Sequence, residues 1–256
     1  MRALASGDVH VRYRLTDSIG ADGGSEWLSA EERERAGRFV FAHDRGSFIA
    51  AHALLRETLS EYEDVPPGAW EFSAGPHGKP ALAGAHAGRD VAFNLAHTRG
   101  LVACAVGRGA LVGIDVEPIE QKIDTLDLAR RFFAPSETQA LEECEEHDRH
   151  IRFIELWTLK EAFVKALGEG LSHPLETFSF AFDGPSALAF EPPPGEDRSA
   201  WRFALFAPSP VHRMALAVRE LPPGDGPAIA TGKLPMYTCA AQPLRLTRGP
   251  VGGFDE

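Results

Sequence analysis

The stretch of residues 111–119, Leu-Val-Gly-Ile-Asp-Val-Glu-Pro-Ile, constrains the fold more than any other part of the chain. Its branched apolar residues recur at every second position, a period that predicts a β-strand. Asp115 and Glu117 are two residues apart, so both carboxylates project from one face, while Ile114 and Val116 anchor the other. Neighbouring carboxylates repel each other unless a cation or a proton lies between them. The pattern indicates a hard-metal site, with a solvated edge strand as the alternative.

The composition of the 256-residue chain is that of an ordinary globular protein, with 44% hydrophobic and 25% charged residues. This length suffices for one large domain or two small ones with a substantial core. A net charge of −11 argues against broad nucleic-acid binding and against docking on anionic membranes, although it permits a local basic pocket. The sequence shows no apolar run of membrane-spanning length, no secretory signal and no paired cysteine motif. We therefore expect a soluble, cytoplasmic protein.

The apolar periodicity along the chain predicts the same order twice, helices first and then an antiparallel meander of strands. In the first half, Ser29 and the glutamates after it form a capping box that predicts the start of a helix, and a second helix is expected over about 44–62. In the second half, helices are expected at 126–133, 136–147 and 149–167. Alternating strands follow them up to residue 218.

The predicted fold class is therefore α+β, with two pseudo-symmetric lobes that each pack a small antiparallel sheet with helices. We expect residues 1–110 to form the N-terminal lobe and residues 111–220 a C-terminal lobe that carries the metal site. Residues 221–256 are rich in proline and glycine and low in pattern, which predicts a peripheral, partly disordered C-terminal extension.

A second group of candidate residues lies on the predicted helix 149–167. Glu161 and Lys165 are one helical turn apart and project together from a face other than the buried stripe. Taken alone, such a pair is an ordinary feature of an exposed helix. Combined with Asp115 and Glu117, however, Glu161 would complete an oxygen-rich site suited to Mg²⁺. Lys165 beside it would supply positive charge for a phosphate or a proton for a leaving group.

Two short motifs carry a resemblance to a known family. Gly113-Ile-Asp-Val-Glu117, followed about forty residues later by Trp157-Thr-Leu-Lys-Glu-Ala-Phe-Val-Lys165, resembles the paired signature of the 4′-phosphopantetheinyl transferases. Each motif is weak alone, whereas the pair at this spacing is specific. The likeness extends over roughly residues 29–218, and the length is similar to that of the two-lobed, surfactin-synthetase-activating branch. The resemblance implies a monomer, because the second lobe supplies what a partner subunit supplies in the short trimeric branch.

The resemblance implies a reaction and a set of residue roles. Coenzyme A donates its phosphopantetheine arm to a serine of an apo acyl, peptidyl or aryl carrier protein, which leaves adenosine 3′,5′-bisphosphate. Asp115, Glu117 and Glu161 would hold Mg²⁺ on the pyrophosphate of coenzyme A. Glu161 is also the candidate base for the carrier serine, and Lys165 would neutralise the departing phosphate. Whether Glu161 is a metal ligand, the base or both stays open.

The nucleotide end of coenzyme A requires basic side chains in a site that is otherwise acidic. The resemblance assigns His97 and the Gly78-Lys79-Pro80 loop to this end. Arg35, by helix register, and Arg45 are further candidates on the first two helices, with a solvated helix face as the alternative for each arginine. Ala96 departs from the family pattern, because many relatives carry serine or threonine there, so one hydroxyl contact to the nucleotide would be missing.

Two other classes of function remain to be weighed. A metal-dependent nucleotide phosphohydrolase would release phosphate without a carrier, but such enzymes carry more metal-binding His and Asp residues than these motifs provide. A non-catalytic protein that binds coenzyme A or a carrier would have no need of Asp115, Glu117, Glu161 and Lys165 together. The sequence does not indicate which carrier proteins are modified or where they dock.

Overall fold

The computed structural model describes most of the chain. The described residues are 4–5, 7–16, 23–75, 77–121, 123–183, 187–220, 228–230, 237–239 and 245–247. Within them the helices are α1 (Ala30–Gly37), α2 (Ala42–Tyr62), α3 (Thr125–Phe132), α4 (Pro135–Glu143) and α5 (Glu146–Leu167). The strands of the first half are β1 (Val9–Leu15), β2 (Phe72–Ala74), β3 (Pro80–Leu82), β4 (Ala92–Thr98) and β5 (Leu101–Gly107). They are followed by β6 (Ala110–Pro118), β7 (Ser179–Asp183), β8 (Ala187–Glu191), β9 (Trp201–Ser209) and β10 (His212–Glu220).

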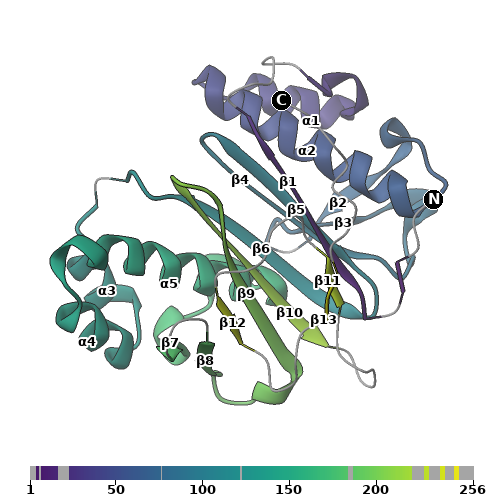
Figure 1. Cartoon of the computed structure of the whole chain (residues 1–256). Coiled ribbons are helices and arrows are strands. Elements are labelled where there is room, and N and C mark those ends of the chain that lie inside the picture. The colour runs from purple at the N-terminus through teal and green to yellow at the C-terminus, as the bar shows by residue number, and fades with distance from the viewer. Residues whose placement is uncertain are drawn as a thin grey trace.

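Two sheets and two long helices form four stacked layers (Figure 1). Helix α2 covers the outer face of a five-stranded sheet of order β13-β11-β1-β5-β4, and α5 covers the outer face of a six-stranded sheet of order β6-β10-β9-β12-β8-β7. The inner faces of the two sheets pack against each other through small and branched side chains. The α+β class with small antiparallel sheets and covering helices is thus confirmed.

The region beyond residue 220 contributes three short strands to these sheets: β11 (Ala228–Ala230), β12 (Tyr237–Cys239) and β13 (Arg245–Thr247). Strand β11 pairs in parallel with β1, and β12 lies between β8 and β9. The predicted C-terminal extension otherwise falls outside the described residues. No helix in the described part of the chain is long and apolar enough to cross a bilayer.

The long helix α5 begins at Glu146, three residues before its predicted start, and α4 ends at Glu143 instead of running on to residue 147. Cys144 and Glu145 adopt non-helical backbone angles between the two helices. Neither residue is a glycine or a proline, so the sequence carries no marker for this break. The predicted helix boundaries in this region are therefore wrong by a few residues.

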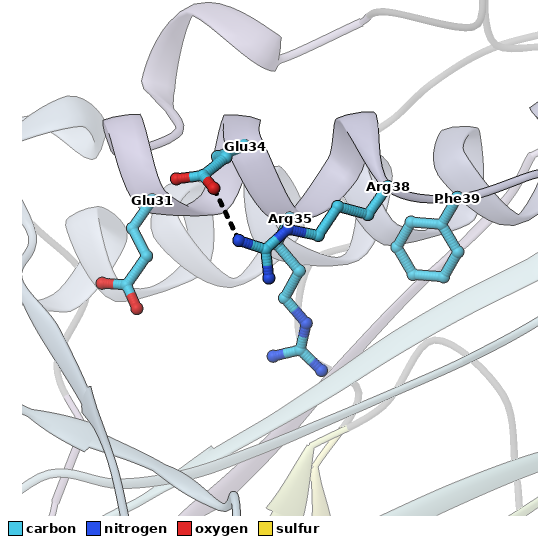
Figure 2. A pocket seen from close by; sticks show the side chains of 5 residues that line it. All are labelled: Glu31, Glu34, Arg35, Arg38 and Phe39. Atoms are coloured by element: carbon cyan, nitrogen blue, oxygen red, sulfur yellow. Dashed lines mark hydrogen bonds and ion pairs between the residues drawn. The ribbon is translucent and has the colours of Figure 1, made fainter.

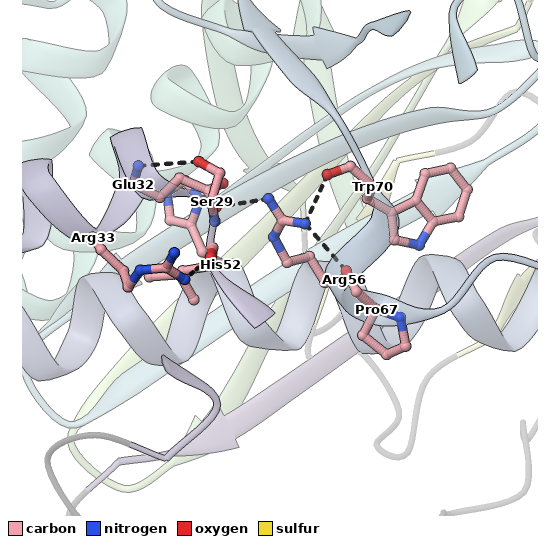
Figure 3. Close-up of polar contacts among 8 residues, drawn as sticks. Ser29, Glu32, Arg33, His52, Arg56, Pro67 and Trp70 are labelled. Atoms are coloured by element: carbon pink, nitrogen blue, oxygen red, sulfur yellow. Dashed lines mark hydrogen bonds and ion pairs between the residues drawn. The ribbon is translucent and has the colours of Figure 1, made fainter. Parts of the chain in front are cut away.

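A buried polar cluster fixes the two helices of the first half to each other (Figure 3). The predicted capping box is present, because Glu32 N donates to Ser29 Oγ at 3.1 Å and Ser29 N donates to Glu32 Oε2 at 2.7 Å. Glu32 also accepts from Arg56 at 2.7 Å and lies 2.9 Å from His52 Nδ1. Burial alone would raise the pKa of Glu32, but these hydrogen bonds and the charges of His52 and Arg56 lower it to about 2. Arg56 further donates to the carbonyls of Pro67 and Trp70.

Candidate active site

Strand β6 presents its two carboxylates to helix α5, as the alternation predicts. Ile114 and Val116 are buried in the cluster between the two sheets, so the odd-numbered residues face the other way. Gly113 is in direct contact with α5: a Cβ placed there would lie 2.0 Å from Ala162 O and 2.4 Å from Ala166 N. The glycine therefore lets the helix approach the strand closely enough for side chains of α5 to reach Asp115.

Lys165 and Asp115 form the closest charged contact of the site. Lys165 Nζ donates to Asp115 Oδ1 at 2.6 Å, and the two side chains are 31% and 7% exposed. Asp115 is nearly buried in the second half of β6, and Lys165 lies in the last turn of α5, so this ion pair joins the strand to the end of the helix. The pair brings the strand motif and the helix motif into one site.

The other two carboxylates of the site resist ionisation. Burial, together with the charges of Asp115 and Glu161, raises the pKa of Glu117 to about 7, although Gln121 donates a hydrogen bond to it at 2.8 Å. Burial and the Asp115 charge likewise raise the pKa of Glu161, and Lys165 opposes this shift. Two acids with a raised pKa beside the Asp115 carboxylate form an electronegative site that a cation would stabilise.

The donor set suits a hard divalent ion, although the groups are not arranged around one. Within the described part of the chain, no three His, Cys, Asp or Glu side chains are grouped so that they could hold a metal. Two buried carboxylate oxygens of this site, Asp115 Oδ2 and Glu161 Oε1, nevertheless lack a hydrogen-bond partner among the described residues. Buried oxygens without a partner cost free energy unless a donor or a cation meets them. Carboxylate oxygens are the ligands that Mg²⁺ prefers, so these residues fit such an ion.

His97 lies between the acidic site and the first two helices. His97 is an exposed residue near the end of β4, but its ring is partly enclosed by its neighbours. This partial burial, with the charge of Lys165 acting in the same direction, lowers the pKa of His97 to about 4. His97 is therefore neutral at pH 7, and its two nitrogens provide one donor and one acceptor. The charges of Asp44 and Arg35 also act on His97, and Ser47 Oγ on α2 donates to Thr98 O at 3.3 Å, so the first turns of α2 lie beside the end of β4.

Arg35 borders an open hollow of about 630 Å³ on α1 (Figure 2). Its guanidinium lies 5.4 Å from the centre of the Phe48 ring on α2, and Arg38 pairs with Glu34 at 2.5 Å on the solvent side. Of the residues that line this hollow, only Arg35 belongs to the predicted site. Arg45 is exposed in the first turn of α2.

The ammonium group of Lys79 is hydrogen-bonded to three backbone carbonyls. Its ammonium donates to Lys165 O at 2.7 Å, to Ala166 O at 3.1 Å and to Val112 O at 3.2 Å. An ammonium has three protons, so these three bonds use all of them. Burial also lowers the pKa of Lys79 to about 8. The flanking residues are placed differently, with Gly78 exposed and Pro80 partly exposed at the start of β3.

Ala96 faces away from the candidate nucleotide residues. Its side chain is 3% exposed and belongs to the apolar cluster between the sheets, whereas the next residue, His97, is exposed. A hydroxyl group at position 96 would thus enter an apolar layer. Asn94, two residues earlier, instead has a polar role, because its side-chain oxygen accepts a hydrogen bond from Ile114 N at 2.8 Å.

A buried ion pair that the sequence did not predict lies on the core side of α5. Lys160 Nζ lies 2.7 Å from Glu137 Oε2 with both side chains fully buried, and it donates to the carbonyls of Leu175 and Phe178. Burial lowers the pKa of Lys160 and raises that of Glu137, and their mutual attraction opposes both shifts. Because Lys160 precedes Glu161 directly, the pair ties the backbone of a site residue to α4 and to the chain leading into β7.

Known proteins match both halves of the chain. A model of the 4′-phosphopantetheinyl transferase superfamily matches residues 111–218, and a model of the N-terminal region of 4′-phosphopantetheinyl transferase matches residues 24–108. The 4′-phosphopantetheinyl transferase HetI of Nostoc sp. is 38% identical over 145 residues, which are 57% of this chain and 61% of HetI. A 4′-phosphopantetheinyl transferase of Bacillus subtilis is 32% identical over 170 residues, 66% of this chain and 73% of the relative.

Two further relatives indicate which type of transferase the chain resembles and how much of each chain the similarity covers. The transferase Sfp of Bacillus subtilis strain 168 is 29% identical over 190 residues, 74% of this chain and 81% of Sfp. The holo-[acyl-carrier-protein] synthase of Thermotoga maritima is 28% identical over 44% of this chain and 65% of its own, with a TM-score of 0.35, too low for a comparison of folds. The chain spans less than two thirds of HetI but about four fifths of Sfp. The chain belongs to the 4′-phosphopantetheinyl transferase superfamily and is similar to its Sfp-type members.

Proposed function

We propose that this protein transfers the 4′-phosphopantetheine arm of coenzyme A to a serine of an apo carrier protein, with Mg²⁺ as cofactor and adenosine 3′,5′-bisphosphate as the second product. The proposal rests on one observation above all. Asp115, Glu161 and Lys165, which come from the two motifs of the family signature, converge on one site between β6 and α5. Membership of the transferase superfamily supports the reaction class.

Asp115, Glu117 and Glu161 are the proposed metal ligands. Burial and the charge of Asp115 raise the pKa of Glu117 and Glu161, and among the described residues Asp115 and Glu161 each keep a buried oxygen without a partner. When bound, Mg²⁺ would neutralise charge on the pyrophosphate of coenzyme A, which is the main requirement of phosphoryl transfer.

Glu161 and Lys165 are the proposed catalytic residues. A carboxylate whose pKa is raised is a better proton acceptor than an ordinary one, so Glu161 suits the removal of the proton from the carrier serine, directly or through a water. The Lys165 ammonium lies 2.6 Å from Asp115 Oδ1, and we propose that it stabilises the phosphate that departs.

The nucleotide end of coenzyme A is proposed to lie on the first half of the chain. Arg35 and His97 are close enough for the arginine charge to act on the imidazole, and a neutral His97 can donate to a phosphate oxygen. Arg45, in the first turn of α2, is a proposed partner for the same anion. Gly78, Lys79 and Pro80 would contact the nucleotide through their backbone, since the Lys79 ammonium is already used.

The domain organisation, oligomeric state, partners and location of the protein are proposed on the same basis. The two family matches meet near residue 110, which supports an N-terminal lobe of residues 1–110 and a C-terminal lobe of residues 111–220. One chain contributes both the acidic site and the candidate nucleotide residues, so a monomer suffices. Carrier proteins and coenzyme A are the proposed partners, and the cytoplasm, where coenzyme A is plentiful, is the proposed location.

Mass spectrometry of several apo carrier proteins tests the function directly. With this protein, coenzyme A and Mg²⁺, each accepted carrier should gain the mass of one phosphopantetheine arm, and a chelator should stop the gain. Glu161→Gln should abolish transfer while the fold persists, and Arg130→Gln, on the exposed surface of α3, serves as the matched control. Absence of any mass gain on all carriers, or full activity of Glu161→Gln, would disprove the proposal.

A further inference from the structure

We propose that Lys79 is a positioning residue, whose ammonium fixes the C-terminal turn of α5 against β6 and thereby sets the position of Lys165 relative to Asp115. This inference rests on the proposed function, since Lys165 matters only if it acts in the transfer. It differs from the role that the resemblance implies for Lys79, which is a contact to the nucleotide.

The end of α5 provides the first part of the argument. The last four carbonyls of a helix have no partner within it and need donors from elsewhere. Gly168 N donates to Val164 O at 2.9 Å, and the Lys79 ammonium takes the next two carbonyls, those of Lys165 and Ala166. A cation also interacts favourably with the negative end of the helix dipole at this place. Lys79 therefore acts as the C-terminal cap of the helix that carries the site.

The edge of strand β6 that does not pair with β10 also supports this role of Lys79. Among the described residues β6 pairs with β10 on one side only, so its other edge needs partners for its backbone. Val112 O accepts from Lys79, and Ile114 N donates to the side chain of Asn94. One ammonium thus bonds the backbone of residue 112, three positions before Asp115, and the backbone of Lys165 itself. The donor comes from a loop 86 residues away in sequence from Lys165.

The surroundings of Lys79 show that this contact is built into the packing. The side chain is partly buried, and burial lowers its pKa, so part of its hydration has been exchanged for the three carbonyls. Gly168, in the left-handed region with φ +77°, lies directly beside the aliphatic stem, because a Cβ there would be in ordinary contact with Lys79 Cδ at 3.4 Å. A lysine that served a phosphate would instead present its ammonium to the open side of the site.

Lys79→Met tests this inference, because methionine keeps the apolar stem and removes all three donors. We expect the turnover number for carrier modification to fall by about 10- to 100-fold, since a displacement of about 1 Å at a catalytic group has effects of that size. The dissociation constant of coenzyme A, measured by calorimetry, should change by less than about threefold, and that of dephospho-coenzyme A, which lacks the 3′-phosphate, should change equally. A direct phosphate ligand predicts the opposite result, selective weakening of coenzyme A binding.

A double-mutant cycle separates positioning from a general loss of stability. If Lys79 acts through Lys165, then Lys79→Met should reduce the turnover of a Lys165→Met protein much less than that of the native protein. Val91→Ala, in the core beneath α2 and away from the site, is the control for destabilisation and should leave turnover unchanged. Should Lys79→Met fail to fold, Lys79→Gln, which keeps two donors, takes its place in the same measurements.

The outcomes are distinguishable. An inactive native protein would refute the proposed function itself. An active native protein together with unchanged turnover of Lys79→Met, purely additive effects in the cycle, or a selective loss of coenzyme A over dephospho-coenzyme A would each overturn the positioning role.

Discussion

Replacement of Gly113 by alanine is a sharp test of how the site is assembled. The added Cβ would lie 2.0 Å from Ala162 O, whereas real Cβ contacts are not shorter than 3.0 Å, so strand and helix must separate by about 1 Å. The obstructing atoms belong to the α5 backbone and cannot rotate away as a side chain could. Such overpacking costs about 1–3 kcal/mol, and the rigid neighbour favours about 3 kcal/mol. That loss corresponds to a fall in Tm of roughly 6–12 °C for a chain of this size.

The same displacement should affect catalysis. Because Glu161 and Lys165 move with α5 while Asp115 stays on β6, we expect turnover to fall by about 10²-fold. Differential scanning fluorimetry and the carrier mass-gain assay measure the two effects. Gly37→Ala, at the end of α1, is the matched control, because its Cβ would meet no described residue within 4 Å. A Gly113→Ala protein as stable and as active as the native one would refute the close approach of β6 and α5.

Three further predictions concern the ionised groups. Glu32 has a pKa lowered to about 2 and a side chain that is 13% exposed, so it should contribute roughly 3 kcal/mol of stability above about pH 4.5 that is lost as the pH falls towards 2. If the free energy of unfolding of Glu32→Gln changed with pH over this range as much as that of the native protein, the prediction would be contradicted. Lys160→Met should cost about 3–5 kcal/mol, because it leaves Glu137 as an uncompensated buried charge, and a loss below about 1 kcal/mol in urea unfolding would argue against the pair. Mg²⁺ should raise the Tm of the native protein but not that of Asp115→Asn, and an equal rise in both would remove Asp115 from the proposed ligands.

The parts of the structure that local periodicity controls were predictable from the sequence. The alternation in β6 placed Asp115 and Glu117 on the face opposite Ile114 and Val116, and the structure turns that face towards α5. The helical spacing of Glu161 and Lys165 placed both on the side of α5 that meets β6. Each of these arrangements depends on neighbours within a few residues, which a sequence states directly.

The contacts between distant segments were not predictable in the same way. Nothing near Lys79 indicates that its partners are carbonyls at the end of α5, and backbone acceptors leave no pattern in a sequence. In the sequence Gly113 is recognisable only as part of a motif, whereas the structure shows that a side chain there would collide with the backbone of Ala162 and Ala166. Glu137 lies on the same helix as the exposed Glu142 and Glu143, yet its side chain is fully buried beside Lys160. These features depend on packing between elements, where tertiary context overrides local character.

The edge of β6 away from β10 lies against β4, and the way in which it is closed has a consequence for solubility. A long terminal strand exposes N–H and C=O groups that can pair with a strand of another molecule and so begin aggregation. Here the side chains of Asn94 and Lys79 occupy two of those groups, Ile114 N and Val112 O. Natural proteins often protect sheet edges with lysine, and this lysine does so from within the same chain. The contacts that shape the site therefore also close this part of the β6 edge to strand pairing with another molecule.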